Sequence, residues 1–403
     1  MAFVTHFFLR TKVSRQDLVS SPRLSSRKTK RCKLVAVAAP RRPSEITQSF
    51  SGGSLLPRNK NNEPWVEQRS RPRRNRKTDA AREMVRETSV APANLVYPVF
   101  IHDKDQDEEI DVMPGCKRLS LRSLLKYAED ALSLGISHII LFPKVAEHQK
   151  SNTADECYNP EGLVPRAVAA LKGAFGSRIT VWTDVALDPY SDQGHDGIVS
   201  NDTRGDNGCA RILNDETVEQ LCRQALCHAR AGADIVAPSD MMDGRIGAIR
   251  DALDSEGFTD VSIVSYAAKY ASSFYGPFRG ALDSAPRETS RAPRDKKTYQ
   301  MDPGNAREAI REAAADVDEG ADMLLVKPGV PYLDIIRLLH ESFYIPVAAY
   351  HVSGEYAMIK AAAQRGWIDE KQVVLETLLC LKRAGATSIL TYYALEAAKW
   401  MQE

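Results

Sequence analysis

Two lysines stand at the ends of apolar runs, where a parallel-sheet enzyme carries its chemistry. Lys269 ends the run VSIVSYAAK, and Lys327 ends the apolar part of MLLVKPG. A buried lysine loses the hydration of its ammonium, which lowers its pKa from about 10.4 towards neutrality, and a second lysine nearby lowers it further. A neutral amine at pH 7 is a nucleophile towards carbonyl carbon. Either lysine alone would more often be a surface residue, but two in matching positions favour a catalytic use.

The segments that must position these lysines follow a regular plan. Four glycines that end helices each precede a short apolar strand: Gly135 before SHIILFP, Gly232 before ADIVAPSD, Gly320 before ADMLLVKP and Gly385 before ATSILTYY. Glycine supplies the left-handed cap of a helix, and the apolar run is typical of a strand buried on both faces. Four further strands are predicted at NLVYPVFI from Asn94, ITVWTDVAL from Ile179, VSIVSYAAK from Val261 and VAAYHVSG from Val347.

Amphipathic stretches lie between the strands, such as LRSLLKYAEDALSLG from Leu121 and NAREAIREAAADVDEG from Asn305. In the second stretch we expect Asn305 to be the N-cap and Glu308 to complete a capping box. Eight strands alternating with helices predict an α/β fold, a (β/α)8 TIM barrel with an extended N-terminal arm. A doubly wound open sheet is the competing architecture, but no GxGxxG motif follows any strand.

Polar side chains gather at the predicted carboxyl ends of the strands, which form the catalytic rim of such a barrel. Besides the two lysines, these strand ends carry Asp184, Ser239, Asp240, Tyr350, Ser353 and Tyr392. Packing alone does not explain so many polar groups at one rim. We therefore expect an active site there.

The composition is that of a globular protein and points to no nucleic-acid or membrane partner. The net charge is +1 over 403 residues, and no apolar stretch reaches the roughly 20 residues of a membrane helix. The seven cysteines are scattered without a CxxC pair, which indicates free thiols in a reducing compartment.

The beginning of the chain differs from the rest. Residues 1–43 hold eleven Lys or Arg and one acid, Asp17, among many serines. This composition is typical of an organelle transit peptide, although a basic tail that binds nucleic acid has a similar composition. We predict a transit peptide over residues 1–43, a linker and arm over 44–88, and a catalytic barrel over 89–403.

Several long motifs resemble those of the plant, chloroplast-type porphobilinogen synthases, also called delta-aminolevulinic acid dehydratases. The matching stretches are RPRRNRKT, TDVALDPYSDQGHDG, APSDMMDGR, SYAAKYASSFYGPFR, KKTYQMDP, MLLVKPG and YHVSGEYAM. They extend from Arg71 nearly to the C-terminus, and motifs of this length in this order are highly specific. The resemblance implies a homo-octamer in the chloroplast stroma that condenses two molecules of 5-aminolevulinate into porphobilinogen, with loss of two waters.

By resemblance, Lys327 and Lys269 each form a Schiff base with one substrate molecule. Asp184 and Asp240 match the acids that move protons or orient the substrate amine. The resemblance assigns the substrate contacts to Arg279, Lys296, Gln300, Ser353, Tyr392, Ser239, Tyr275 and Phe278. Residues 276–298 match an active-site lid, and the sequence FYGPFRGALDSAP suits a segment that moves.

The metal content is where the chain departs from animal and yeast relatives. Those enzymes carry three cysteines where this chain has Ala186, Asp188 and Asp196, so a thiolate zinc site is excluded. Carboxylate oxygens prefer Mg2+. We expect Mg2+ as the cofactor, with Glu312 matching a regulatory site, while Asp188 and Asp196 either bind an ion or line a wet loop.

Two other functions compete with this interpretation. An aldolase-like barrel would also place one lysine on strand six, but it needs neither a second lysine nor two carboxylate pockets. A non-catalytic oligomer scaffold would have lost the polar rim, which this chain retains.

Overall fold

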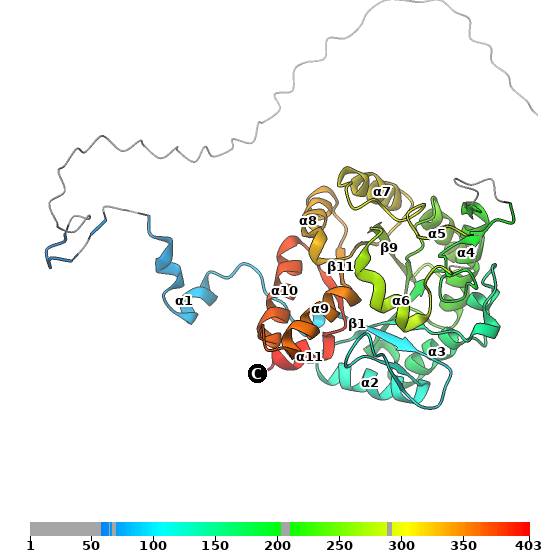
Figure 1. Cartoon of the computed structure of the whole chain (residues 1–403), viewed down its shortest axis with the longest axis horizontal. Helices are drawn as coiled ribbons and strands as arrows, with labels where there is room; N and C mark the ends of the chain where they lie inside the picture. Colours follow the sequence, from blue (N-terminus) through cyan, green and yellow to red (C-terminus); the bar gives the residue numbers. More distant parts are fainter. Residues whose placement is uncertain (1–57, 64, 67–69, 203–209, 288–291) are drawn as a thin grey trace, which may run out of the picture. The chain divides into compact units, whose positions relative to one another are not determined.

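Eight apolar strands and the helices around them make up most of the computed structural model (Figure 1). The structure describes residues 58–63, 65–66, 70–202, 210–287 and 292–403. The predicted transit peptide, 1–43, lies outside these residues, and the predicted arm, 44–88, is described only from residue 58 onwards, with gaps.

The eight predicted strands are all present, and they form one closed parallel barrel. Their bounds are β1 Leu95–Ile101, β4 His138–Pro143, β5 Thr180–Val185, β8 Ile235–Pro238, β9 Ser262–Lys269, β10 Met323–Lys327, β11 Val347–His351 and β12 Ser388–Thr391. Each strand pairs with the next in chain order, and β12 closes on β1 with Leu95 opposite Ile389. The predicted (β/α)8 barrel is confirmed.

Helices alternate with the strands and surround them (Figure 1). The α-helices are α1 Asp79–Met84, α2 Leu121–Ser133, α3 Leu163–Phe175, α4 Asn214–Arg230, α5 Arg245–Ser255, α6 Gly276–Leu282, α7 Arg307–Asp318, α8 Leu333–Ser342, α9 Ser353–Gln364, α10 Glu370–Ala384 and α11 Ala394–Trp400. Each of the four predicted capping glycines has a positive φ. At Gly385 a side chain would also clash, because a Cβ there would lie 2.5 Å from the His340 ring.

Short strands and 3-10 turns lie between the main elements of the barrel. β3 (Lys117–Leu119) pairs with β1 and with β2 (Glu108–Glu109), and β6 (Ile198–Val199) pairs with β7 (Ile212–Leu213). Two 3-10 turns, η7 (Ser273–Tyr275) and η8 (Val330–Tyr332), follow β9 and β10. Both turns directly succeed the lysine-bearing strands.

The predicted capping box at Asn305 is wrong. The helix α7 begins two residues later, and its N-cap is Ala306. The Asn305 side chain instead donates a hydrogen bond to the Glu308 carboxylate at 2.8 Å. The backbone carbonyl of Asn305 accepts a hydrogen bond from the Tyr270 hydroxyl. The side chains of Asn305 and Glu308 therefore bond to each other, and neither caps the first turn of α7.

The chain divides into two units, residues 1–74 and 75–403. In the first, Asn59 organises a turn in which its side chain accepts the backbone N–H of Asn61 and Glu63. The second unit contains the barrel. Among the described residues, no helix combines the length and the apolar character needed to cross a bilayer.

Candidate active site

The two lysines lie side by side at the carboxyl ends of neighbouring strands. Lys269 on β9 and Lys327 on β10 are direct partners in the parallel pairing. Each is only 5% exposed. Because the carboxyl ends of barrel strands face the catalytic mouth, both amines belong to the same rim.

Lys327 sits in an aromatic environment. Its Nζ lies 4.8 Å from the ring centres of Phe278 and Tyr350, 5.2 Å from that of Tyr275 and 5.3 Å from that of Tyr266. Burial lowers the pKa of Lys327 to about 7, and the charge of Lys269 acts in the same direction. A substantial fraction of this amine is therefore neutral near pH 7, as the sequence predicted.

Lys269 sits in a polar environment. Its Nζ donates to the Ser239 carbonyl and forms an ion pair of 3.2 Å with Asp196. The two neighbouring amines therefore have different surroundings, which the sequence did not indicate.

Asp184 lies at the end of β5, close enough to both lysines for their charges to act on its carboxyl group. Burial raises the pKa of Asp184 to about 7, while Lys327, Lys269 and a hydrogen bond from Ser239 oppose that rise. One carboxylate oxygen, Oδ1, has no hydrogen-bond partner among the described residues. A carboxyl group that titrates near pH 7 with a free oxygen beside an amine can donate or accept a proton.

A second acidic cluster surrounds Lys296. Its Nζ lies 3.0 Å from Asp188 and 2.8 Å from Asp196. Asp196 also accepts the Tyr299 hydroxyl at 3.0 Å, and the nearby lysines hold its pKa well below the usual range. These two aspartates therefore bind ammonium groups in this structure.

Asp240 lies at the same rim but faces a different partner. Its Oδ1 accepts the Met242 N–H at 2.7 Å, and its Oδ2 lies 3.6 Å from the Arg245 guanidinium. Burial raises the pKa of Asp240 to about 6. No ion pair joins Asp240 to Lys269 within the described part of the chain, and the role of Asp240 in the reaction stays a prediction.

The residues predicted to hold the first substrate lie close to Lys327. The Ser353 hydroxyl, at the start of α9, accepts the Phe278 N–H at 3.0 Å. The Tyr392 hydroxyl lies 2.8 Å from that of Tyr350. Tyr275 donates its hydroxyl proton to the Lys327 carbonyl at 2.9 Å. The structure therefore gathers all of these groups at one end of the barrel.

Arg279 and Gln300 come from the segment after β9. Arg279 lies on α6, half-buried, with its guanidinium 5.9 Å from the Tyr275 ring centre. Gln300 is buried, and its Oε1 has no hydrogen-bond partner among the described residues. The predicted lid, 276–298, includes α6, but residues 288–291 lie outside the described residues, and its motion stays a prediction.

Tyr266 is a member of the site that the sequence analysis missed. It lies three residues before Lys269, and strict alternation would place the two side chains on opposite faces of β9. The pairing of β9 with β10 contains an irregularity, because Ser265 pairs with Leu324 whereas Ala268 pairs with Val326. The extra residue on β9 returns Tyr266 to the inner face.

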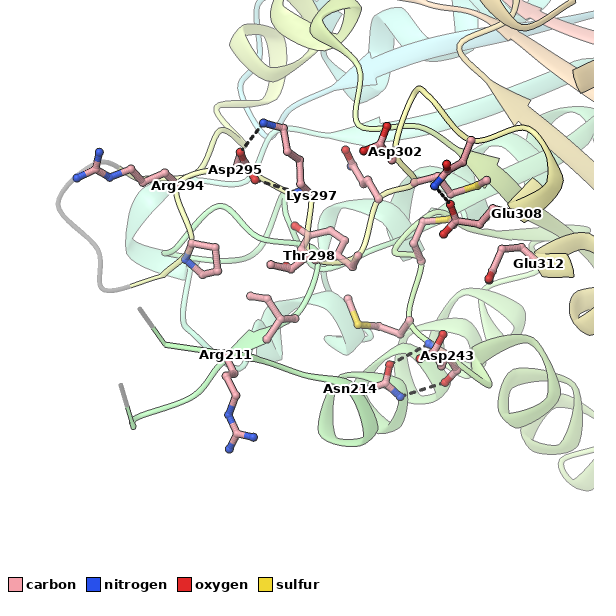
Figure 2. Close-up of a pocket in the computed structure, with 18 of the residues that line it drawn as sticks. Arg211, Asn214, Asp243, Arg294, Asp295, Lys297, Thr298, Asp302, Glu308 and Glu312 are labelled. Carbon is pink, nitrogen blue, oxygen red and sulfur yellow. Dashed lines mark hydrogen bonds and ion pairs between the residues drawn. The ribbon is translucent and has the colours of Figure 1, made fainter. Parts of the chain in front are cut away.

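Glu312 lies apart from the lysines, in the wall of a polar cavity of about 1200 Å³. Figure 2 shows Glu312 and Glu308 on α7, and Asp243, from the segment between β8 and α5, lines the same cavity. Burial raises the pKa of Glu312, and the charges of Asp316 and Asp243 raise it further. A cation in this cavity would relieve that repulsion.

The fold and the two-lysine rim define a (β/α)8-barrel protein with an amine-bearing site, and comparisons with known proteins agree. The pattern of the delta-aminolevulinic acid dehydratase family matches residues 69–400. A chloroplastic delta-aminolevulinic acid dehydratase of Chlamydomonas reinhardtii is 57% identical over 82% of this chain and 84% of its own length. One from Arabidopsis thaliana is 59% identical over 81% of this chain and 74% of its own.

A solved structure is also similar. The delta-aminolevulinic acid dehydratase of Toxoplasma gondii ME49, crystallised with its reaction product porphobilinogen, is 56% identical. The match covers 86% of this chain and 96% of the other, with a TM-score of 0.82. The chain belongs to the delta-aminolevulinic acid dehydratase family. The plant and algal relatives are named chloroplastic, which confirms the predicted chloroplast location.

Proposed function

We propose that this chain condenses two molecules of 5-aminolevulinate into porphobilinogen, with release of two waters, as an early step of tetrapyrrole synthesis. The observation that carries the proposal is the direct pairing of Lys327 with Lys269, both buried at the end of neighbouring strands. Two amines on adjacent strands bring two carbonyl substrates together, which removes much of the entropic penalty of a bimolecular condensation.

Lys327 is the amine best suited to attack, because its pKa is lowered to about 7 and it forms no ion pair with a carboxylate among the described residues. Its amine adds to the ketone carbon of one substrate and loses water to form an iminium. The iminium withdraws electrons more strongly than the ketone does, so addition at that carbon and loss of an adjacent proton become easier. Asp184, with its pKa raised to about 7, is placed to transfer these protons.

Lys269 receives the second substrate. Its ion pair with Asp196 holds the amine 3.2 Å from the carboxylate until a substrate displaces it. The adjacent carbonyl of Ser239 fixes the direction of the amine. Asp240 stabilises the segment after β8, because its carboxylate accepts a hydrogen bond from the Met242 N–H.

Separate groups bind the two substrate carboxylates. Ser353 and Tyr392 are hydroxyl donors near Lys327, and Tyr275 and Phe278 pack on the same side. Arg279 and Lys296 supply positive charge for the second carboxylate, with Gln300 beside them. Lys296 holds Asp188 and Asp196 in this structure, so binding requires it to exchange one aspartate for the substrate.

We propose that Mg2+ binds at Glu312, because a half-buried carboxylate with acidic neighbours and room for water suits a hard cation. No group of three or more His, Cys, Asp or Glu side chains arranged for a metal occurs among the described residues, so the ion would keep several waters. Bound there, Mg2+ would supply structural and regulatory charge. Asp188 and Asp196 do not fit a metal, because Lys296 and Lys269 already neutralise them.

A homo-octamer is proposed for the assembly. Support for self-association comes from large apolar side chains that face solvent in the single chain, among them Trp367, which is 72% exposed, Met358 and Tyr344. Surfaces of this kind are often covered by another subunit. Mass measurement of the purified protein, with and without Mg2+, tests the assembly.

The decisive experiment traps the substrate on the enzyme. Addition of 5-aminolevulinate followed by borohydride should attach the substrate covalently to Lys327, with Lys269 labelled more slowly, and peptide mass mapping locates each adduct. Adduct formation with a sugar phosphate on one lysine would indicate an aldolase instead. The absence of any adduct together with the absence of porphobilinogen formation would refute the proposed function.

A further inference from the structure

Glu355 is a buried carboxylate that the reaction above does not use. It lies on the first turn of α9, is 6% exposed, and forms no ion pair with a cation among the described residues. Burial raises the pKa of Glu355 to about 7, while three backbone N–H groups oppose the rise. A buried acid without a counter-ion is destabilising unless its hydrogen bonds have a structural use.

The hydrogen bonds of Glu355 join the exits of two neighbouring strands. Its Oε1 accepts the Val330 N–H at 2.8 Å, and the Gly329 N–H also bonds to the carboxylate. Its Oε2 accepts the Val352 N–H at 2.6 Å. Val352 has no side-chain acceptor, so only the glutamate half of a capping box exists here.

The two segments held by this carboxylate are those that carry the first-substrate groups. Gly329 and Val330 follow Lys327 by two and three residues, and Val352 directly precedes Ser353. A single side chain therefore fixes the exit of β10 against the exit of β11.

The surrounding packing makes this fixed arrangement sensitive to small shifts. A Cβ on Gly354 would lie 2.5 Å from the Phe274 carbonyl, so the start of α9 already touches the 273–275 turn. The Ser353 hydroxyl bonds to the Phe278 N–H, and the Tyr275 hydroxyl bonds to the Lys327 carbonyl. Movement of either strand exit would therefore move the aromatic groups around the Lys327 amine.

We propose that Glu355 is a positioning residue that holds Lys327 and Ser353 at the separation required by one substrate molecule. The inference rests on the proposed function for the identity of that substrate, but the positioning of the lysine is testable without it. Glu355 touches no reacting atom. It acts by fixing the backbone on both sides of the pocket for the keto acid.

The test compares three variants. Glu355→Gln keeps the size of the side chain but replaces one acceptor oxygen with an NH2 group that faces a backbone donor. Glu355→Asp keeps the charge and shortens the reach by one methylene. Asp322→Asn is the control, because the Asp322 carboxylate accepts the Ile263 N–H at 2.7 Å and joins β9 to β10 at the other end of the barrel.

The first readout is the rate of reductive methylation of each lysine by formaldehyde and cyanoborohydride at pH 7.5, followed by peptide mass mapping. In Glu355→Gln we expect the rate at Lys327 to fall at least about fivefold, because a displaced strand exit admits water and returns the amine to its charged form. The rate at Lys269 should change less than about twofold. Asp322→Asn should leave both rates unchanged.

The second readout is turnover of 5-aminolevulinate. Displacement of a substrate-binding group by about 1 Å lowers rate about 100-fold, so kcat/KM should fall about 10- to 100-fold in Glu355→Gln. Borohydride should trap less substrate on Lys327 relative to Lys269. Because Ser353 shifts together with Lys327, we expect KM to rise as well as kcat to fall, whereas Asp322→Asn should alter stability alone.

The outcomes separate the two proposals. If Glu355→Gln folds with the thermal stability of Asp322→Asn and methylates at Lys327 at the wild-type rate, the positioning role is overturned, whatever the substrate. If the wild-type protein forms no adduct with 5-aminolevulinate, the proposed function fails while the methylation comparison still decides the role of Glu355. Should Glu355→Gln not fold, Glu355→Asp is measured against the same thresholds.

Discussion

Lys269 and Lys327 are direct partners across one pair of parallel strands, yet among the described residues only Lys269 forms an ion pair with a carboxylate. Lys327 is surrounded by four aromatic rings instead. Burial lowers the pKa of Lys327, whereas an ion pair with Asp196 holds Lys269. We therefore expect the Lys327 amine to attack a carbonyl substrate first.

Replacing Lys327 with methionine should abolish turnover while stabilising the fold. Turnover should fall more than about 10³-fold, because the nucleophile is lost. The pKa of Lys327 is about 7 in the folded protein and 10.5 when unperturbed, so the unfolded state binds more protons between these values. The stability gain of Lys327→Met should therefore be largest below about pH 7, on the order of 1–3 kcal/mol, and should vanish as the pH approaches 10.5. Denaturant unfolding at pH 6.5 and 9.5 measures the difference.

The matched control for that experiment is Lys269→Met. It removes an amine that pairs with Asp196, so it should lower stability at pH 7 instead of raising it. Equal stability changes of the same sign in both variants would contradict the difference between the two amines. Porphobilinogen formation should be lost in both.

Replacing Asp184 with asparagine should lower the pKa of Lys327 further. The Asp184 carboxylate is the largest of the charges that raise this pKa, so its removal favours the neutral amine. The pH profile of methylation at Lys327 should move to lower pH, while porphobilinogen formation falls about 10²- to 10⁴-fold through loss of the proton carrier. Asp240→Asn serves as the comparison, because Asp240 contacts Arg245 and the Met242 N–H. In that variant the pH profile of methylation at Lys327 should not move.

Much of the barrel could be predicted because its signals are local. The apolar runs and their capping glycines lie within about ten residues of one another, so both lysines could be placed at strand ends from the sequence alone. The capping box at Asn305 could not be judged in this way, because Tyr270, 35 residues earlier in the chain, binds the Asn305 carbonyl.

The electrostatics of the site could not be predicted, because they depend on distant pairings. Lys296 and Asp188 are 108 residues apart in the chain and 3.0 Å apart in space. The inward position of Tyr266 depends on one extra residue in the pairing of β9 with β10, which no alternation pattern reveals. Residue types therefore indicated the chemistry, and tertiary contacts determine which amine lies among aromatic rings and which one pairs with a carboxylate.

Asp196→Asn should destabilise the protein more than Asp188→Asn. Within the described parts of the chain, Asp196 pairs with both Lys269 and Lys296, whereas Asp188 pairs only with Lys296. Removal of one partner from a buried pair costs about 3–5 kcal/mol. In Asp188→Asn, Lys296 still pairs with Asp196, whereas in Asp196→Asn, Lys269 loses its ion pair. Because the pKa of Asp196 is depressed in the fold, its contribution is present above about pH 4 and is lost as the pH falls below that value. Urea unfolding at pH 8 should rank the two variants, and an equal loss in both would contradict the double pairing.

Glu312→Ala should retain basal activity but lose its stimulation by Mg2+. The half-buried carboxylate has acidic neighbours, and removing it leaves the cavity with less charge to attract a cation. Assay of porphobilinogen formation over a Mg2+ titration, combined with size-exclusion chromatography, should show a flat response and smaller assemblies. Glu308→Ala is the control on the same helix, because the Glu308 carboxylate already accepts a hydrogen bond from the Asn305 side chain. The response of this variant to Mg2+ should match that of wild type. A normal Mg2+ response in Glu312→Ala would remove this residue from the proposed metal site.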